Sequence, residues 1–177
     1  MEVSTTVSAE SGAPPEGASA SAGDRTAQFI TFTIGAEEYG VDIMAVREIK
    51  GWIETTTVPK APAYVRGVIN LRGVIVPIFD LRARFGGKLT EPTKSHVVII
   101  VTVGARVIGL LVDAVSDILT VERDAIRPVP EMERRAEDGF LDGLVAIDSR
   151  MVTLISLANL FHADHGTLDA VAGAVTH

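Results

Sequence analysis

Apolar and polar side chains follow one another along much of this chain with the two-residue period of β-strands. In residues 28–34 the side chains of Ile30 and Phe32 alternate with those of Phe29 and Thr31, and β-branched and aromatic residues dominate. Four hairpins are predicted, formed by residues 28–34 with 38–41, 65–69 with 74–79, 97–103 with 107–112, and 144–147 with 151–155. Many short strands joined by tight turns predict sheets that close into barrels or pack as sandwiches.

The order of these segments repeats, which indicates an internal duplication. The sequence FTIGAEEYG at 32–40 matches VTVGARVIG at 101–109, and VPIFDLRARF at 76–85 matches VTLISLANLF at 152–161. Each half therefore contains a hairpin, a linking turn, a second hairpin and a short capped helical turn. Because a half of about 60–70 residues is too small for an ample core, the two halves are expected to pack tightly as one unit.

Three short helical segments are predicted, at residues 42–48, 80–85 and 156–161. The second and third begin at N-cap residues, Asp80 and Ser156. In the first, Ile43 and Val46 are three positions apart and would share one face of the helix. Irregular, proline-containing connections are predicted at residues 57–63 and 124–138.

Composition restricts the classes of function. Residues 1–25 and 163–177 hold few large apolar side chains, so they cannot repay the entropy of ordering. The formal net charge of −7 argues against sequence-independent binding of nucleic acid and against docking on anionic lipid. The chain starts without a signal peptide, lacks an apolar run of about 20 residues, and has no cysteine. A cytoplasmic protein is therefore expected.

Convergent ionisable groups, which an enzyme needs, are few. His162 and His165 could contact a metal as a pair, but no third ligand accompanies them. Asp113 and Asp117 follow a strand, and turn formation is predicted for them rather than catalysis. The glycines lie singly at turns, and no serine lies in a nucleophile-elbow pattern. No catalytic residue, metal site or cofactor is therefore predicted.

The segment YVRGVINLRGVIVPIFDLR at 64–82 carries the most specific motif. Asn70 opens a tight turn through side-chain hydrogen bonds, Gly73 closes it with a positive φ, and Arg72 is held at the tip of a stiff hairpin. The combination VxNLRGxxxPxxDLR fixes turn, strand and helix-start residues together. It closely resembles the signature of the CheW family, the adaptors that couple chemoreceptors to the CheA histidine kinase. The resemblance extends over roughly residues 28–161.

The resemblance implies an all-β fold of two intimately packed SH3-like five-stranded β-barrels with short helical turns. The CheW-like domain is expected over residues 26–163, between a disordered tail at 1–25 and a C-terminal tail at 164–177. The implied function is that of a non-catalytic adaptor, which couples methyl-accepting chemotaxis receptors to CheA and supports receptor control of kinase activity. The implied partners are the cytoplasmic tip of the receptors and the regulatory domain of CheA, at arrays near the inner membrane, with no nucleic acid and no membrane insertion.

The resemblance also implies a set of residues that bind the receptor or the kinase: Ile43, Val46, Glu48, Gly67, Arg72, His96 and Val97. From the residues alone, Ile43 and Val46 face either the core or a partner, and family resemblance favours a receptor groove for Val46. Glu48 and Arg72, at positions associated with coupling in CheW proteins, pair with each other or with partners.

Gly67 is predicted to shape a bulge or a close backbone approach, and its substitution would also perturb the adjoining binding surface. His96 and Val97 open the strand that begins the second half, and the resemblance places them near the groove for the receptor tip. CheW proteins often have a small polar residue at the position of His96.

Three other classes of function are alternatives to the adaptor. A regulator such as CheV would need a phospho-receiver domain, and a detached regulatory domain of CheA would share the fold but come from a kinase. An enzyme on a β-barrel would need a pocket with several ionisable groups. None of these features is recognised in the chain, so the adaptor is the expected function.

Overall fold

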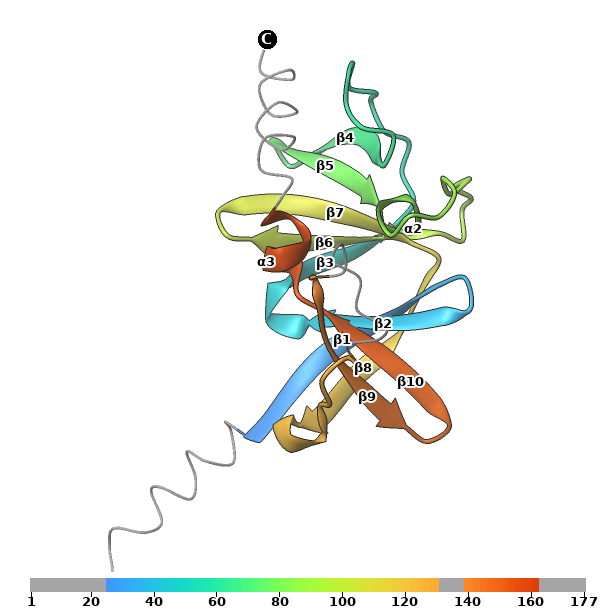
Figure 1. The fold of residues 1–177 in the computed structure, drawn as a ribbon. Helices are drawn as coiled ribbons and strands as arrows, with labels where there is room; N and C mark the ends of the chain where they lie inside the picture. Colours follow the sequence, from blue (N-terminus) through green and yellow to red (C-terminus); the bar gives the residue numbers. More distant parts are fainter. Residues whose placement is uncertain (1–24, 131–138, 163–177) are drawn as a thin grey trace, which may run out of the picture.

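The computed structural model describes residues 25–130 and 139–162 (Figure 1). Apart from Arg25, the predicted tails at 1–25 and 164–177 lie outside these residues, as do residues 131–138 of the predicted loop at 124–138. The described strands form two five-stranded sheets, which lie one above the other in Figure 1. This arrangement confirms the predicted all-β, SH3-like fold.

The first sheet has the strand order β8–β1–β2–β10–β9. Its strands are β1 (Thr26–Ile34), β2 (Glu37–Asp42), β8 (Ala114–Glu122), β9 (Leu141–Ile147) and β10 (Arg150–Ile155). The second sheet has the order β3–β6–β7–β5–β4. Its strands are β3 (Val46–Gly51), β4 (Val65–Leu71), β5 (Val74–Asp80), β6 (Val97–Val103) and β7 (Arg106–Val112).

All four predicted hairpins are present, as β1–β2, β4–β5, β6–β7 and β9–β10. Both predicted capped turns are also present, as α2 (Leu81–Arg84) after Asp80 and α3 (Leu157–Leu160) after Ser156. The side chain of each cap residue accepts a hydrogen bond from the backbone N–H three residues later. Short local signals were therefore sufficient for these elements.

The predicted helix at 42–48 is wrong. Only Ile43–Ala45 forms a single 3₁₀ turn, η2, capped by the Asp42 carboxylate, which accepts a 2.9 Å hydrogen bond from the Met44 N–H. The following residues belong to β3, which pairs antiparallel with β6. Pairing with a distant strand thus overrides the three-residue spacing of Ile43 and Val46. Strand β8, which pairs with β1 and is followed by the 3₁₀ turn η3 (Arg123–Ala125), was also not predicted.

The two sheets reproduce the internal duplication, but they exchange strands between the halves. Strands β1 and β2 occupy the places in the first sheet that β6 and β7 occupy in the second. Strand β10 runs parallel to β2, just as β5 runs parallel to β7. Each sheet therefore combines the first hairpin of one half with three strands of the other. As a result, the second sheet comes from the continuous segment 46–112 and the first from the segments on either side.

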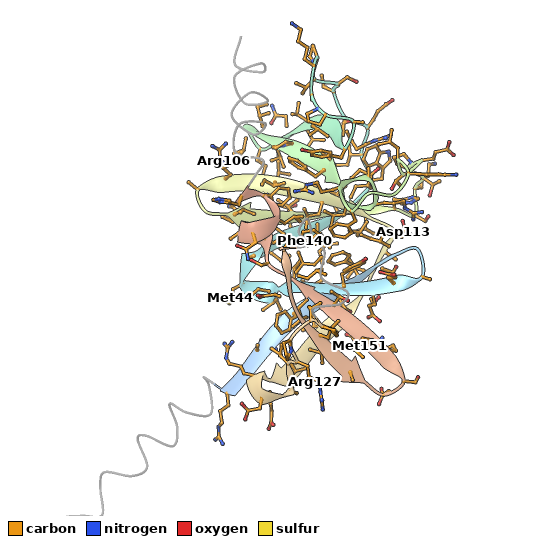
Figure 2. The ribbon with its side chains drawn as sticks, viewed as in Figure 1. Met44, Arg106, Asp113, Arg127, Phe140 and Met151 are labelled. Carbon is orange, nitrogen blue, oxygen red and sulfur yellow. The ribbon has the colours of Figure 1, made fainter. Side chains whose placement is uncertain are left out.

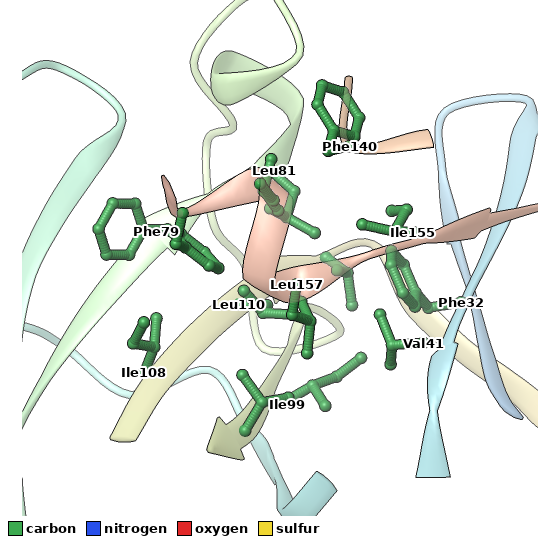
Figure 3. Close-up of a cluster of buried hydrophobic side chains, with 14 of the residues drawn as sticks. Phe32, Val41, Phe79, Leu81, Ile99, Ile108, Leu110, Phe140, Ile155 and Leu157 are labelled. Atoms are coloured by element: carbon green, nitrogen blue, oxygen red, sulfur yellow. The ribbon is translucent and has the colours of Figure 1, made fainter. Parts of the chain in front are cut away.

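The main hydrophobic core joins the two sheets (Figure 3). It includes Phe32 and Val41 of the first sheet and Ile99 and Leu110 of the second, all fully buried. The capped turns contribute as well, because Phe161 at the end of α3 packs edge-to-face on a phenylalanine of β5, with ring centroids 4.8 Å apart. The two halves thus act as one packed unit, as predicted.

Neither sheet closes by a continuous strand ladder, but one isolated bridge joins the ends of each. In the second sheet Thr56 and Val68 exchange two backbone hydrogen bonds, of 2.9 and 2.8 Å. In the first sheet Arg127 and Leu144 exchange two of 2.9 and 2.8 Å. These bridges connect the segment that follows β3 to β4 and the segment that follows β8 to β9, which gives each sheet its barrel-like curvature.

Gly67 stands beside the first of these bridges. It lies at a bulge in β4 with φ of +131°, and a Cβ atom there would be 2.4 Å from the carbonyl oxygen of Thr56. Gly143 occupies the corresponding place in β9, where a Cβ atom would be 3.0 Å from the Arg127 carbonyl oxygen. The missing side chain therefore lets the closing segment approach the strand.

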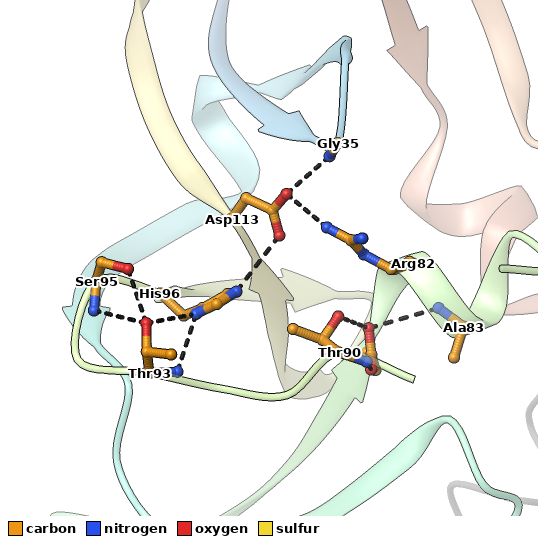
Figure 4. A network of polar contacts seen from close by, with 9 residues as sticks. Gly35, Arg82, Ala83, Thr90, Thr93, Ser95, His96 and Asp113 are labelled. Carbon is orange, nitrogen blue, oxygen red and sulfur yellow. Dashed lines mark hydrogen bonds and ion pairs between the residues drawn. The ribbon is translucent and has the colours of Figure 1, made fainter. Parts of the chain in front are cut away.

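A polar network joins the sheets where the chain crosses from β7 to β8 (Figure 4). The Asp113 carboxylate accepts hydrogen bonds from the Gly35 N–H at 2.7 Å and from the Arg82 guanidinium at 2.6 Å. Burial raises the pKa of Asp113, but the Gly35 N–H and the Arg82 charge lower it more, so the pKa lies below its ordinary value. The network ties the β1–β2 turn of the first sheet to α2 beside the second.

Replacement of Gly67 by alanine is expected to destabilise the protein by about 2–4 kcal/mol, because it adds backbone strain to a clash with Thr56. Urea unfolding measures the change. Gly51→Ala is the matched control, since a Cβ atom at that β3 position meets nothing within 4 Å. Equal stability of the two variants would contradict the closure role of Gly67.

Replacement of Asp113 by asparagine is expected to cost about 1–3 kcal/mol near neutral pH, because Arg82 loses a partly buried anionic partner. The Asp113 carboxylate has a lowered folded pKa, so its contribution is present above the ordinary value of 3.8 and is lost as pH falls through the folded value. The stability difference should therefore shrink in acid. Asp117→Asn, at an exposed residue of β8, should leave the stability unchanged throughout.

Candidate functional site

Glu48 and Arg72 meet across the seam of the second sheet, the gap between its edge strands β3 and β4. Glu48 pairs with Ile100 in the β3–β6 register, and its carboxylate forms an ion pair with the Arg72 guanidinium at the tip of the β4–β5 hairpin. Lys50 Nζ lies 3.4 Å from the other carboxylate oxygen. The structure thus places two predicted site residues together and pairs them with each other.

The hairpin tip holds Arg72 in a fixed backbone conformation. Arg72 and Gly73 both have positive φ, of 50° and 88°, which is typical of a two-residue type I′ turn. The Asn70 side chain accepts a 2.8 Å hydrogen bond from the Gly73 N–H, as its place in the motif predicted. The Arg72 side chain is 71% exposed, whereas that of Glu48 is 26% exposed. The arginine therefore keeps much of its surface available beside its ion pair.

The ion pair stabilises the charged form of Glu48. Hydrogen bonding from Arg72 lowers the pKa of Glu48, partial burial opposes this shift, and Lys50 lowers the pKa further. Because the folded pKa is lowered, the interaction is present above the ordinary value of 4.5 and is lost as pH falls through the folded value. Glu48 is therefore an anion near neutral pH, and the seam carries two cations around one carboxylate.

Ile43 and Val46 lie at the first crossing between the sheets, on η2 and at the start of β3. Both are partly buried and pack against the main core. Each side chain is therefore part of the core and also keeps some exposed surface for a partner. Between them Met44 is 88% exposed (Figure 2). Met44 was not among the predicted site residues, although its apolar side chain within the segment DIMA at 42–45 was the available signal.

Gly67 is buried, and the absence of a side chain lets the backbone of Thr56 lie close to β4, in agreement with its predicted geometry. It lies on β4, the edge strand that ends at the hairpin tip of Arg72. Its effect on the neighbouring surface remains a prediction.

His96 belongs to the Asp113 network. Its Nδ1 atom accepts a 2.9 Å hydrogen bond from the Thr93 N–H, and its Nε2 atom lies 3.5 Å from an Asp113 oxygen. The side chain is 16% exposed. Val97 is partly buried against the main core and pairs with Gly51 and Val112 in the sheet. These two residues are therefore held within the structure, and the contact of His96 with Asp113, for which only turn formation was predicted, was not foreseen from the sequence.

The predicted site residues do not form one cluster. Val46 pairs with Val101 at one end of the β3–β6 ladder, whereas Val97 pairs with Gly51 at the other end. The seam pair, the first crossing and the Asp113 network are thus three separate places. In Figure 2, Met44 and Asp113 mark opposite edges of the boundary between the sheets.

A groove of about 1080 Å³ opens along the first sheet, and none of the predicted site residues lines it. Its wall includes Tyr39 and Phe140, which flank Phe85 with ring centroids 5.1 and 5.0 Å away. The ion pair between Glu38 and Arg150, at 3.4 Å, lies at its rim. Sequence reasoning did not find this groove, because its residues come from distant segments.

Within the described ranges, no group of three His, Asp or Glu side chains could hold a metal ion. Asp113 and Asp117 do not act as a carboxylate pair, since Asp117 accepts a hydrogen bond from the Ile118 N–H. His165, the second residue of the predicted histidine pair, lies outside the described residues. A search of the described helices finds none with the length and apolar character to span a membrane.

Comparisons with known proteins agree on one family. Residues 28–165 match the family described as CheW-like domain. A probable chemotaxis protein CheW of Rhizobium etli is 53% identical over 78% of this chain and 88% of its own length. The chemotaxis protein CheW of Klebsiella aerogenes is 41% identical over 80% of this chain and 85% of its own length.

A solved structure supports the same relationship. The crystal structure of the scaffolding protein TtCheW from Thermoanaerobacter tengcongensis superposes with a TM-score of 0.69 at 33% identity, covering 76% of this chain and 87% of that chain. Family match, sequence identity and fold therefore coincide over the same region. The chain belongs to the CheW family of chemotaxis scaffold proteins, and it is an adaptor rather than an enzyme.

Proposed function

We propose that this protein couples methyl-accepting chemotaxis receptors to the histidine kinase CheA, in arrays near the inner membrane. Family membership supports the scaffold role, and the observation that carries the finer proposal is the Glu48–Arg72 pair. A hairpin tip of fixed conformation presents a largely exposed arginine, so little conformational entropy is lost when a partner binds it. The CheW-like domain at 26–163 is the unit that acts.

The receptor tip is proposed to dock at the first crossing between the sheets. A helical hairpin recognised in this way lays an apolar face against an apolar surface. Met44 supplies exposed apolar area on a turn capped by Asp42, and Ile43 and Val46 supply the partly buried floor beside it. Val97 and His96 lie at the other end of the β3–β6 ladder, so they are proposed as a second, separate contact.

The regulatory domain of CheA is proposed to bind through a barrel of the same construction, close to the seam of the second sheet. Exposed Ile49 on β3 and Val74 on β5 flank the seam pair and supply apolar contact area. Contacts that are weak individually become effective when repeated across an array. Control of the kinase then follows from its position and conformational equilibrium.

Co-sedimentation tests the proposal directly. The full chain is mixed with a receptor cytoplasmic fragment and with CheA, and kinase activity is followed in the pellet. The expected result is a ternary assembly in which kinase activity depends on the receptor only when this chain is present. Failure to bind either partner would contradict the coupling function and leave the family assignment intact.

Loss of either seam residue is expected to uncouple the kinase without unfolding the protein. Arg72→Ala and Glu48→Ala should leave the melting temperature nearly unchanged, because exposed ion pairs contribute little to folding, while receptor-dependent kinase activation falls. The exchange Glu48→Arg with Arg72→Glu is the control, since it restores a pair with reversed polarity. Coupling should stay low in this variant if Arg72 contacts a partner, and full recovery would assign the pair a purely structural role.

Truncation of Val46 separates its two roles. Because the side chain is partly buried, Val46→Ala should cost about 0.5–1.5 kcal/mol of stability. The variant molecules that remain folded should also bind the receptor more weakly. Val101→Ala is the matched control, because Val101 is its fully buried partner in the ladder. The control should lose more stability and keep its affinity. Urea melts beside receptor titrations measure both, and intact binding by folded Val46→Ala would exclude Val46 from the groove.

A further inference from the structure

Charge is unevenly divided between the two sheets. The segment 46–112, which forms the second sheet and is called here the basic unit, holds ten Lys and Arg against four Asp and Glu, a formal net charge of +6. The remainder of the chain holds six Lys and Arg against nineteen Asp and Glu, a formal net charge of −13. The overall charge of −7 is therefore divided unevenly along the sequence.

The described residues alone show the same division. Outside the basic unit, residues 25–45, 113–130 and 139–162 hold four Lys and Arg against nine Asp and Glu, a formal net charge of −5. These segments form the first sheet and are called here the acidic unit. Because the two sheets lie at opposite ends of the molecule (Figure 1), the charges are separated along its long axis.

The anions of the basic unit do little to mask its cations. Asp80 is fully buried and accepts hydrogen bonds from the Thr90 N–H at 2.7 Å and hydroxyl at 2.8 Å. Glu48 is engaged by Arg72 and Lys50 in the seam. Glu54 and Glu91 are thus the two acidic residues of this unit that remain exposed without an ion pair to a described residue.

Several cations of the basic unit are available to a partner. Within the described part of the chain, five have no ion pair: Arg47, Lys60, Arg66, Lys88 and Lys94. They come from β3, from β4 and from the connecting loops. A distributed charge of one sign acts through its summed field, which steers an oppositely charged partner before contact.

The same unit also carries most of the large exposed apolar side chains that the structure describes. Five of eight lie in it: Ile49, Ile53, Val74, Ile75 and Leu89. A unit that carries both exposed apolar side chains and unpaired cations is suited to a protein surface that offers apolar residues together with carboxylates. Lipid and nucleic acid present anionic groups without the exposed apolar side chains of a protein surface, so they match one of these two features and not both.

We propose that the basic unit is a docking pole for an acidic protein surface, and that the acidic unit disfavours the reversed approach. Binding energy comes from the apolar contacts, and the charge separation selects which end of the adaptor a partner meets. Identification of this partner as the receptor or CheA rests on the proposed function. The existence of the pole does not.

In the first experiment the full chain is titrated with poly-L-glutamate in low salt, and binding is measured from changes in the amide chemical shifts. Shifts are expected in residues 46–112 and should disappear as salt is added. Lys60→Glu with Lys94→Glu should weaken binding about tenfold, because two exposed cations become anions. Shifts confined to the acidic unit, shifts spread evenly, or stronger association with anionic lipid vesicles would each overturn the proposal.

The control reverses two exposed charges of the acidic unit, Glu122→Lys with Asp142→Lys. It changes the net charge by the same amount in the opposite direction and should tighten or preserve poly-L-glutamate binding at residues 46–112. Circular dichroism establishes that both double variants are folded. Equal weakening in both variants would show that no pole exists.

The second experiment measures association with a receptor fragment and with CheA. For the partner that meets the pole, the double variant Lys60→Glu with Lys94→Glu should associate severalfold more slowly in low salt, while its dissociation rate stays unchanged. In high salt the association rates of the variant and the unaltered chain should become equal. Rates that are insensitive to the variants for both partners would overturn the proposal and leave the coupling function standing. If neither partner binds the unaltered chain, the coupling function fails, and the poly-L-glutamate titration still decides whether the pole exists.

Discussion

The exchange of hairpins between the two halves is the constraint on which this structure depends. After strand β2 of the first sheet, the chain crosses at η2 and begins the second sheet at β3. It returns after β7, at Asp113, to begin β8. Because each sheet needs strands from both halves, neither half can fold alone into its sheet, and the core between them is shared from the outset. Many strand pairings are consequently long-range, which raises the entropic cost of closing the loops between them during folding.

The proposed partner surfaces follow from the same constraint. A crossing strand must turn tightly between two packed sheets, and η2 does so with Ile43 and Val46 inward and Met44 outward. A strand that starts after a crossing becomes a sheet edge, and β3 therefore faces β4 across a gap. The Thr56–Val68 bridge and the Glu48–Arg72 ion pair both span this gap. The proposed partner sites thus lie where the architecture leaves edges and turns.

Sequence reasoning succeeded where local chemistry determines structure. The four hairpins, the caps at Asp80 and Ser156 and the Asn70 turn follow from signals within a few residues. It failed where pairing with a distant strand determines the local structure. The helix predicted over 42–48 is an example, because residues from Val46 onward form β3 and pair with β6. The Glu48–Arg72 pair joins residues 24 positions apart, and the network around Asp113 joins residues up to 78 apart. From the sequence the Glu48–Arg72 pair was one of two open alternatives, and the Asp113 network was not predicted, because no local signal connects residues so far apart.

The duplication also explains why charge matters to this adaptor. A protein made of two similar barrels would present two similar ends, and a partner could not distinguish them by backbone shape. The corresponding hairpin tips illustrate how side chains remove this ambiguity. Arg72 and Asp148 occupy equivalent turns with φ of 50° and 53°, yet their charges are opposite. The corresponding turn position thus carries opposite charge in the two sheets, which gives each end of a near-symmetric architecture its own chemistry.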